Sequence, residues 1–143
     1  MSHLVAIALG SNLGDRAHYL RSAIDRLKAG IRVVRVSPFI ESDAVNSPTG
    51  SGSYLNCGLT GHTRLDPAQL LAFTEEIEFS LGRRIKGGNR PRTIDIDLIF
   101  HGSARIRSRT LQIPHPRWAE RSFVFEPLSA IGAPWIPSWT ADL

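Results

Sequence analysis

Two aspartates separated by a single residue lie inside an otherwise apolar run from Thr93 to Phe100. The β-branched and aromatic side chains of this run predict a strand, and side chains along a strand alternate between the two faces of a sheet. Asp95 and Asp97 would therefore share one face, with their Cα atoms about 7 Å apart. Two ionised carboxylates at that separation in a mostly buried sheet repel one another and lose hydration unless a cation lies between them.

A pair of divalent metal ions is a natural way to relieve this repulsion. Mg²⁺ binds through a few carboxylates together with substrate phosphates rather than through a full protein cage. Asp95 and Asp97, with Arg92 just before the strand, provide such a set. Short Asp-x-Asp patterns are nevertheless common, and the pair could instead face solvent on an edge strand or form salt bridges with arginines. The spacing by itself leaves these alternatives open.

The segment that leads into the acidic strand is strongly basic and contains Gly87 and Gly88. Five of its ten residues carry a positive charge: Arg83, Arg84, Lys86, Arg90 and Arg92. Arginine suits phosphate binding because its planar guanidinium bonds phosphate oxygens in pairs and stays ionised. The segment predicts a clamp for a polyphosphate whose remaining charge is neutralised by metal. A solvated basic loop is the alternative.

A second candidate for phosphate binding is the turn from Gly10 to Arg16, which could expose backbone N–H groups at the start of a helix. It lacks the Walker spacing and the Gly-Lys-Ser/Thr ending, so a tight turn with a helix cap explains it better. His115 lies between two prolines and could present its imidazole to an anion. An isolated histidine of this kind is more often structural.

Several other polar and aromatic residues have two readings each. Glu75 and Glu78 lie on a helix whose apolar face is supplied by other residues, so a solvated helix face explains them. Tyr54, Trp118 and Phe123 could belong to the core or could sandwich a planar ring, and their spacing does not decide between the two.

The elements that must position these residues follow the order β-α-β-β-α-β. We expect strands at 4–9, 31–36, 54–60 and 93–100, and helices at about 16–29 and 67–81. This order matches the split βαβ, ferredoxin-like α+β arrangement, in which two helices pack on one face of an antiparallel sheet. After Gly102 we expect a further strand, a helical turn around Trp118 and a helix, while the last dozen residues show no clear periodicity.

Composition sets limits on the class of protein. The chain has 143 residues, of which 42% are hydrophobic and 21% charged. This length and balance predict a single folded domain over residues 1–143. The formal net charge of +4 suits an anionic small molecule, a phosphate-rich ligand or a nucleic acid, and does not choose among them.

The single cysteine and the N-terminus bear on the compartment. Cys57 is the only cysteine, which excludes an intramolecular disulfide and a cysteine-rich zinc site, and its apolar surroundings predict a small core residue. The apolar stretch at residues 4–9 is too short to span a membrane, and no basic region precedes a signal-length apolar core. The sequence therefore predicts a cytoplasmic protein with no membrane contact.

Five short motifs occur in order along the chain, at residues 8–14, 54–56, 81–83, 91–97 and 113–116. Together they resemble the 6-hydroxymethyl-7,8-dihydropterin pyrophosphokinase family, and the Pro-Arg-Thr-Ile-Asp-Ile-Asp string at 91–97 is highly specific for it. The similarity runs from about residue 4 to about residue 131. It implies a ferredoxin-like fold and transfer of an intact pyrophosphoryl group from ATP to the pterin hydroxymethyl oxygen, giving AMP, in folate biosynthesis.

The same resemblance implies two Mg²⁺ ions, ATP as co-substrate and the reduced pterin as substrate. We further expect a monomer with no nucleic-acid or membrane partner. Asp95 and Asp97 would ligate both metals, and Asp97 would also orient or deprotonate the pterin hydroxyl. Arg83 and Arg92 would assist the transfer. The implied pterin contacts are Ser42, Tyr54, Asn56 and Phe123. The implied nucleotide contacts are Glu75, Glu78, Arg83, Arg84, Arg92, Ile99, His115 and Arg121.

The chain departs from the family pattern just before the acidic strand. Family members usually have Arg-Trp-Gly-Pro-Arg-Thr there, whereas this chain has Asn89 and Arg90 in place of the tryptophan and the glycine. A homologue that binds pterin and nucleotide but turns over poorly is therefore one alternative. A ferredoxin-like nucleic-acid-binding module is another, although the central strands lack the paired exposed aromatics expected for base stacking.

Overall fold

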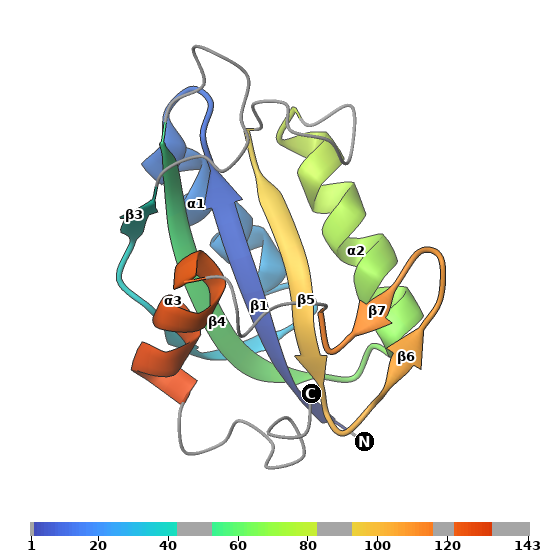
Figure 1. Cartoon of the computed structure of the whole chain (residues 1–143). Helices are drawn as coiled ribbons and strands as arrows, with labels where there is room; N and C mark the ends of the chain where they lie inside the picture. Colours follow the sequence, from blue (N-terminus) through green and yellow to red (C-terminus); the bar gives the residue numbers. More distant parts are fainter. Residues whose placement is uncertain (1, 43–52, 83–92, 116–121, 133–143) are drawn as a thin grey trace.

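The structure is a computed structural model that describes residues 2–42, 53–82, 93–115 and 122–132 (Figure 1). Within these residues the chain forms an antiparallel sheet, a small separate hairpin and three helices. The strands are β1 (His3–Ser11), β2 (Arg32–Val36), β3 (Ile40–Ser42), β4 (Tyr54–Thr63), β5 (Asp95–His101), β6 (Ile106–Arg107) and β7 (Gln112–Ile113). The helices are α1 (Arg16–Leu27), α2 (Pro67–Ser80) and α3 (Ser122–Gly132).

The main sheet has the strand order β2-β4-β1-β5, and β3 also pairs with β4. Every pair in it is antiparallel. The four strands and two helices predicted up to residue 100 are all present, but three details differ. β1 continues through Gly10 and Ser11, which we had assigned to a turn, β4 continues to Thr63, and β3 was not predicted. Each of these extensions depends on a partner strand that is distant in the sequence.

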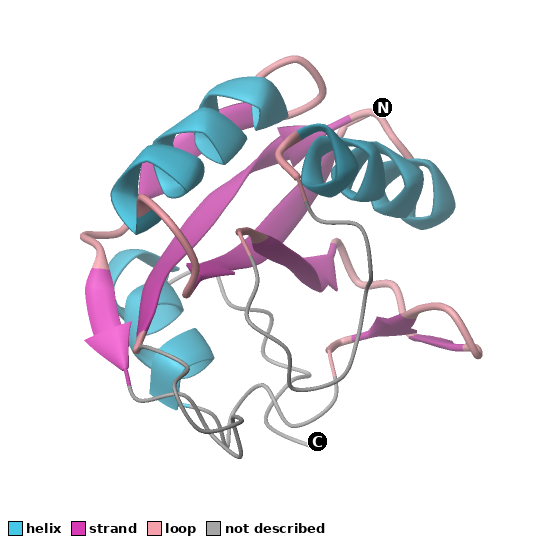
Figure 2. Cartoon of the chain, turned by 90° about the horizontal axis from the view of Figure 1, so that it is seen from above, coloured by secondary structure: helices cyan, strands magenta, loops and turns pink. Residues whose placement is uncertain are grey.

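Helices cover both faces of this sheet. α1 and α2 lie side by side on one face, and α3 lies on the opposite face over β4 (Figures 1 and 2). The close approach of α3 depends on Gly58, because a Cβ atom at this position would come within 2.9 Å of Leu128 Cδ2. The nitrogen of Leu128 would lie only 3.1 Å away. The sheet is therefore the middle of three layers.

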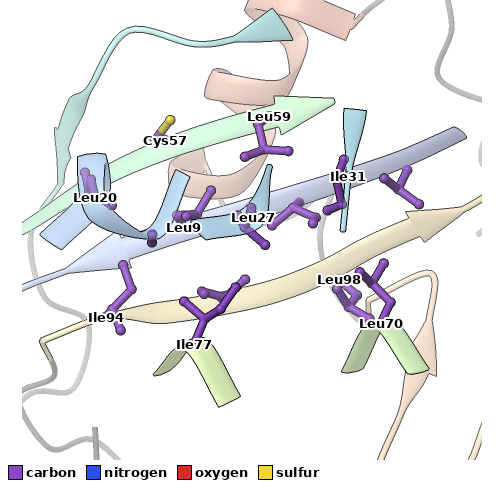
Figure 3. Packing of buried hydrophobic residues seen from close by; sticks show 14 of the residues in the cluster. Leu9, Leu20, Leu27, Ile31, Cys57, Leu59, Leu70, Ile77, Ile94 and Leu98 are labelled. Atoms are coloured by element: carbon purple, nitrogen blue, oxygen red, sulfur yellow. The ribbon is translucent and has the colours of Figure 1, made fainter. Parts of the chain in front are cut away.

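The main hydrophobic core fills the space between the sheet and the pair α1 and α2. Val5, Ile7 and Leu9 alternate along β1 and point into this space with less than 4% of their surface exposed. Side chains from both helices and from β4 and β5 meet them there (Figure 3). These include Leu20, Leu27, Cys57, Leu59, Leu70, Ile77, Ile94, Ile96 and Leu98.

Both long helices begin with aspartate caps. Asp15 accepts a hydrogen bond from the backbone N–H of His18 at 3.1 Å, and Gly14 precedes it with φ of 74°. Asp66 and Gln69 form a reciprocal capping box at the start of α2, where Pro67 is the first helical residue. The cap reading of the turn after β1 is thus confirmed.

The region after Gly102 differs in part from the prediction. In place of one added strand, β6 and β7 form a two-stranded antiparallel hairpin outside the main sheet. The added helix is present as α3, and its last turn receives a hydrogen bond from Arg35, whose Nη1 lies 3.2 Å from the carbonyl of Ile131. The predicted turn around Trp118 lies outside the described residues. Among the helices described, none has the length and apolarity needed to span a bilayer.

Candidate active site

Toward Ser11, the face of β1 that is turned away from α1 and α2 carries three small residues, Ala6, Ala8 and Gly10. The register with β5 sets Asp95 opposite Gly10 and Asp97 opposite Ala8. Directly opposed residues of an antiparallel pair point to the same side. Both aspartates therefore share the face opposite the main core, as the alternation in the sequence predicted, and both side chains are half-buried.

The same face continues across Gly10 into β4, where Asn56 is its opposite residue. Asn56 is buried, and its Nδ2 donates to Ser42 Oγ at 2.7 Å and to the carbonyl of Ile40 at 3.1 Å. A Cβ atom at Gly10 would lie 3.3 Å from Asn56 Oδ1 and 3.3 Å from Tyr54 Cδ1. The amide oxygen and the tyrosine ring thus lie over Gly10, next to the aspartates.

Ser42 is the last residue of β3 and is paired with Tyr54, the first residue of β4. Because Ile40 is paired with Asn56, all of these residues belong to the same face of the sheet. The structure therefore brings together five of the predicted site residues from three strands. These are Ser42, Tyr54, Asn56, Asp95 and Asp97.

Phe123, the fourth predicted pterin contact, belongs to the first turn of α3, and this helix packs on the same side of the sheet. Its side chain is outside the described part of the chain. The predicted arginines also fall outside the described residues, together with the segment that departs from the family pattern. They are Arg83, Arg84, Arg92 and Arg121.

Glu78 contradicts the solvated reading that the sequence favoured. Its side chain is only 3% exposed, and Oε2 accepts the backbone N–H of Ile96 at 2.8 Å. Ile96 is the residue between the two aspartates, on a strand that forms the edge of the sheet. A buried carboxylate thus bonds the outer side of β5 between Asp95 and Asp97. Glu75, by contrast, is exposed, as a solvated helix face requires.

Ile99 lies further along β5, and His115 follows β7. Ile7 is opposite Leu98 and Ala6 is opposite Phe100, so Ile99 has no opposite residue and forms a bulge. Its side chain is fully buried, and its carbonyl accepts the backbone N–H of His115 at 3.1 Å. The half-buried His115 is therefore fixed beside the strand that carries the aspartates, at a backbone position that a sequence pattern does not reveal.

The two carboxylates form a donor set that suits magnesium. In the described ranges no group of three or more histidine, cysteine, aspartate or glutamate side chains gathers as a metal site. Two carboxylates leave most coordination positions to phosphate oxygens and water, which is the manner in which Mg²⁺ usually binds. Asp95 and Asp97 could therefore hold magnesium together with a bound polyphosphate.

Cys57 takes no part in this chemistry. It lies opposite Leu9 on the core face, and burial raises the pKa of its thiol from 9.0 to about 11. Hydrogen bonds with Ser37 act in the opposite direction and are outweighed. The thiol is neutral at physiological pH, as expected of the small core residue that the sequence predicted.

Comparisons with known proteins identify the family of the chain. The model of the 7,8-dihydro-6-hydroxymethylpterin-pyrophosphokinase family matches residues 6–133. The chain belongs to this family. As a member of the pyrophosphokinase family it is an ATP-dependent diphosphotransferase, so the resemblance drawn from the five motifs is confirmed.

Two bacterial relatives are named 2-amino-4-hydroxy-6-hydroxymethyldihydropteridine pyrophosphokinase. The one from Bacillus subtilis is 40% identical over 133 residues, covering 92% of this chain and 79% of the relative. The one from Aquifex aeolicus is 35% identical over 127 residues, covering 89% and 79%. A mitochondrial folate synthesis bifunctional protein from Pisum sativum is 38% identical over 141 residues, and the match spans only 27% of its length.

Solved structures share the fold at low sequence identity. An HPPK-DHPS crystal structure in complex with substrates superposes with a TM-score of 0.68 at 12% identity, over 92% of this chain and 40% of that one. The Plasmodium falciparum HPPK-DHPS gives a TM-score of 0.65, also at 12% identity, over 92% and 39%. The mixed α/β architecture with an antiparallel sheet and three helices is therefore that of known pyrophosphokinase structures.

Sequence reasoning missed two parts of the site. The first is the row of small residues on β1, which lies beside the proposed site residues. Ala6, Ala8 and Gly10 alternate with larger residues, but the whole strand is apolar, so this alternation in side-chain size was overlooked. The bond from Ile96 to Glu78 had no such signal, because an acidic residue in the last turns of a helix is ordinarily solvated.

Proposed function

We propose that this chain transfers the terminal pyrophosphoryl group of ATP to the hydroxymethyl oxygen of 6-hydroxymethyl-7,8-dihydropterin in folate biosynthesis. The products are AMP and the pterin diphosphate. The observation that carries the proposal is the register that sets Asp95 and Asp97 on one face with Asn56 and Tyr54. A carboxylate pair suited to metal-bound phosphates thus adjoins an amide and an aromatic ring suited to a flat heterocycle.

In this reaction the pterin hydroxymethyl oxygen attacks the β-phosphorus of ATP, and the bond from that phosphorus to the oxygen bridging it to the α-phosphorus breaks. AMP leaves with the bridging oxygen. Asp95 and Asp97 would hold two Mg²⁺ ions, which would supply neutralisation of the phosphate charge during the transfer. Asp97 orients the alcohol or accepts its proton. Arg83 and Arg92 stabilise the charge on the transferred group.

The pterin occupies the Tyr54 end of the site. Tyr54 and Phe123 stack on its faces, while Asn56 and Ser42 read its hydrogen-bonding edge. The hydrogen bonds from Asn56 to Ser42 and to the Ile40 carbonyl support this role, because they fix the amide with its oxygen over Gly10. A fixed amide discriminates between hydrogen-bonding patterns better than a rotating one.

The nucleotide lies toward β5 and the C-terminal part of α2. The proposed contacts are Glu75, Glu78, Arg83, Arg84, Arg92, Ile99, His115 and Arg121. Burial of Glu78 against Ile96 and the backbone bond between His115 and Ile99 support an ordered wall at this end of the strand.

The remaining features of the proposal concern the whole chain. We assign residues 1–143 to one pyrophosphokinase domain that acts as a cytoplasmic monomer. Its arrangement is ferredoxin-like, with the sheet order β2-β4-β1-β5 and two helices on one face in support, plus an added hairpin and helix.

The direct test mixes the protein with ATP, Mg²⁺ and the reduced hydroxymethylpterin and separates the nucleotides by anion-exchange chromatography. We expect AMP in step with the pterin diphosphate and no AMP without Mg²⁺. Formation of ADP would contradict the proposal. Tight binding of both substrates by calorimetry without AMP would instead identify a homologue impaired in turnover, and salt-sensitive binding of single-stranded RNA alone would identify a nucleic-acid-binding module.

A further inference from the structure

Arg16, the first residue of α1, bridges two segments that meet at the pterin end of the sheet. Its Nη2 donates to Glu41 Oε1 on β3 at 2.6 Å. Its Nη1 donates to both oxygens of Ser53, at 3.0 Å to the carbonyl and at 3.1 Å to Oγ. Ser53 immediately precedes β4, so one guanidinium holds β3 and the start of β4 together.

These contacts are made from the side of the sheet that faces away from the site. Glu41 is paired with Leu55, and Leu55 is opposite Ser11, which follows Val5, Ile7 and Leu9 on the core face. The neighbouring pair, Ser42 and Tyr54, points to the site face. Arg16 thus acts on the residues next to two proposed pterin contacts without sharing their face.

The site needs such a support because β3 has little of its own. It contains three residues and, among the strands that the structure describes, pairs only with β4, so a few hydrogen bonds fix the position of Ser42. Ser42 in turn accepts the Asn56 amide proton at 2.7 Å. A displacement of β3 would therefore be passed to the residue that reads the pterin edge.

We propose that Arg16 is a positioning residue for pterin recognition. Its guanidinium clamps Glu41 and Ser53 from behind the sheet and so sets the places of Ser42, Tyr54 and Asn56. This inference rests on the proposed function, because it assigns those three residues to the pterin. An exposed ion pair contributes little to folding stability, and Glu41 is 62% exposed. Loss of the pair should therefore change the positions of the site residues more than the stability of the fold.

Steady-state kinetics of Arg16→Ala tests the proposal, with Arg21→Ala as the matched control. Arg21 is an exposed arginine of the same helix, so its loss changes the net charge equally. We expect Arg16→Ala to raise the KM for the pterin by about tenfold, which is below the roughly hundredfold loss that a misplacement of about 1 Å can cause. The KM for ATP should change by less than about twofold in both variants, and the melting temperatures should match.

Three further variants separate a specific clamp from a general structural role. Arg16→Lys keeps the charge but has no planar fork to reach both partners, so it should restore the pterin KM only in part. The double mutant Arg16→Ala, Glu41→Ala should raise the pterin KM by less than the product of the two single rises, because both substitutions break the same ion pair. Exchange of the charges in Arg16→Glu with Glu41→Arg should recover part of the loss.

Equal KM values for the pterin in wild type, Arg16→Ala and Arg21→Ala would overturn the proposal. Equal rises in the KM for the pterin and the KM for ATP in Arg16→Ala would also overturn it. So would a rise in the pterin KM of the double mutant equal to the product of the two single rises. If Arg16→Ala unfolds, pterin binding to Arg16→Lys and Glu41→Ala at a temperature where both are folded decides the matter. Failure of the proposed function is a separate outcome, because it appears as the absence of AMP with the wild-type protein.

Discussion

The two faces of β1 differ in side-chain size and in what lies on them. One face carries Val5, Ile7 and Leu9, which are packed against α1 and α2. The other carries Ala6, Ala8 and Gly10, and the register sets Asp95 and Asp97 beside them. One strand thus supplies both the centre of the core and the floor of the site.

This difference separates stability from function at the level of single residues. Large side chains on the core face remove apolar surface from water, which is the main source of folding free energy. Small side chains on the site face leave space for ligands and allow Tyr54 and Asn56 to approach the backbone of Gly10. Substitutions one residue apart should therefore have effects of different kinds, and four predictions test this.

The largest effect is expected for Asp97→Ala and Asp95→Ala on the site face. Each removes a proposed metal ligand, so kcat should fall by about a thousandfold or more. The melting temperature should stay the same or rise slightly because carboxylate repulsion is relieved. Asp25→Ala on the exposed side of α1 is the control and should leave kcat unchanged. Loss of folding in the Asp97 variant would show instead that Asp97 stabilises the fold.

Next is Ile7→Ala, one residue before Ala8 on the core face. Its side chain is fully buried, so truncation should lower the free energy of unfolding by about 2 to 5 kcal/mol. Urea denaturation followed by circular dichroism measures this. Below the unfolding transition, kcat should remain within about threefold of wild type, since the mutation leaves the site face intact. A large loss of kcat with unchanged stability would contradict the assignment of the core face of β1 to stability.

Gly10→Ala sharpens the comparison at the site itself. The new methyl group would meet Asn56 Oδ1 and the Tyr54 ring, each at 3.3 Å, so both must move by a few tenths of an ångström. We expect the pterin KM to rise by about fivefold with a loss of stability near 1 kcal/mol. The KM for ATP serves as the internal control, and an equal rise there would show that the methyl group disturbs more than the pterin end.

The smallest effect at working pH concerns Cys57 on the core face. Burial raises the pKa of its thiol to about 11, so the unfolded chain releases this proton first as the pH rises above 9.0, the ordinary value. The native state then binds more protons than the unfolded state, and stability should fall between pH 9 and 11. Cys57→Ala should show a shallower decline in urea titrations over this range, while activity at pH 7 depends little on the residue.

Much of this arrangement follows from local sequence patterns. Period-two alternation assigned Asp95 and Asp97 to one face, and sequence patterns located the helices at about 16–29 and 67–81 that the structure has as α1 and α2. These features depend on residues within one element, where backbone geometry alone fixes which side chains share a face. The order of elements then restricts how the sheet can be built.

Other features depend on partners far apart in the chain. Strand register sets Asn56 and Asp95 on either side of Gly10, and Arg16 contacts Glu41 and Ser53 from 25 and 37 residues away. The short strand β3 is defined by its pairing with β4, and three residues are too few for a periodic pattern to predict a strand.

The sequence by itself determined the four longer strands and the first two helices, the shared face of the two aspartates and, through its motifs, the family. The tertiary structure decided which residues surround that face, because register and packing set neighbours that local periodicity does not encode. Glu78 shows the difference most clearly. Its helical position indicated solvent, yet the edge of β5 offered the unpaired N–H of Ile96, and a buried hydrogen bond formed there instead.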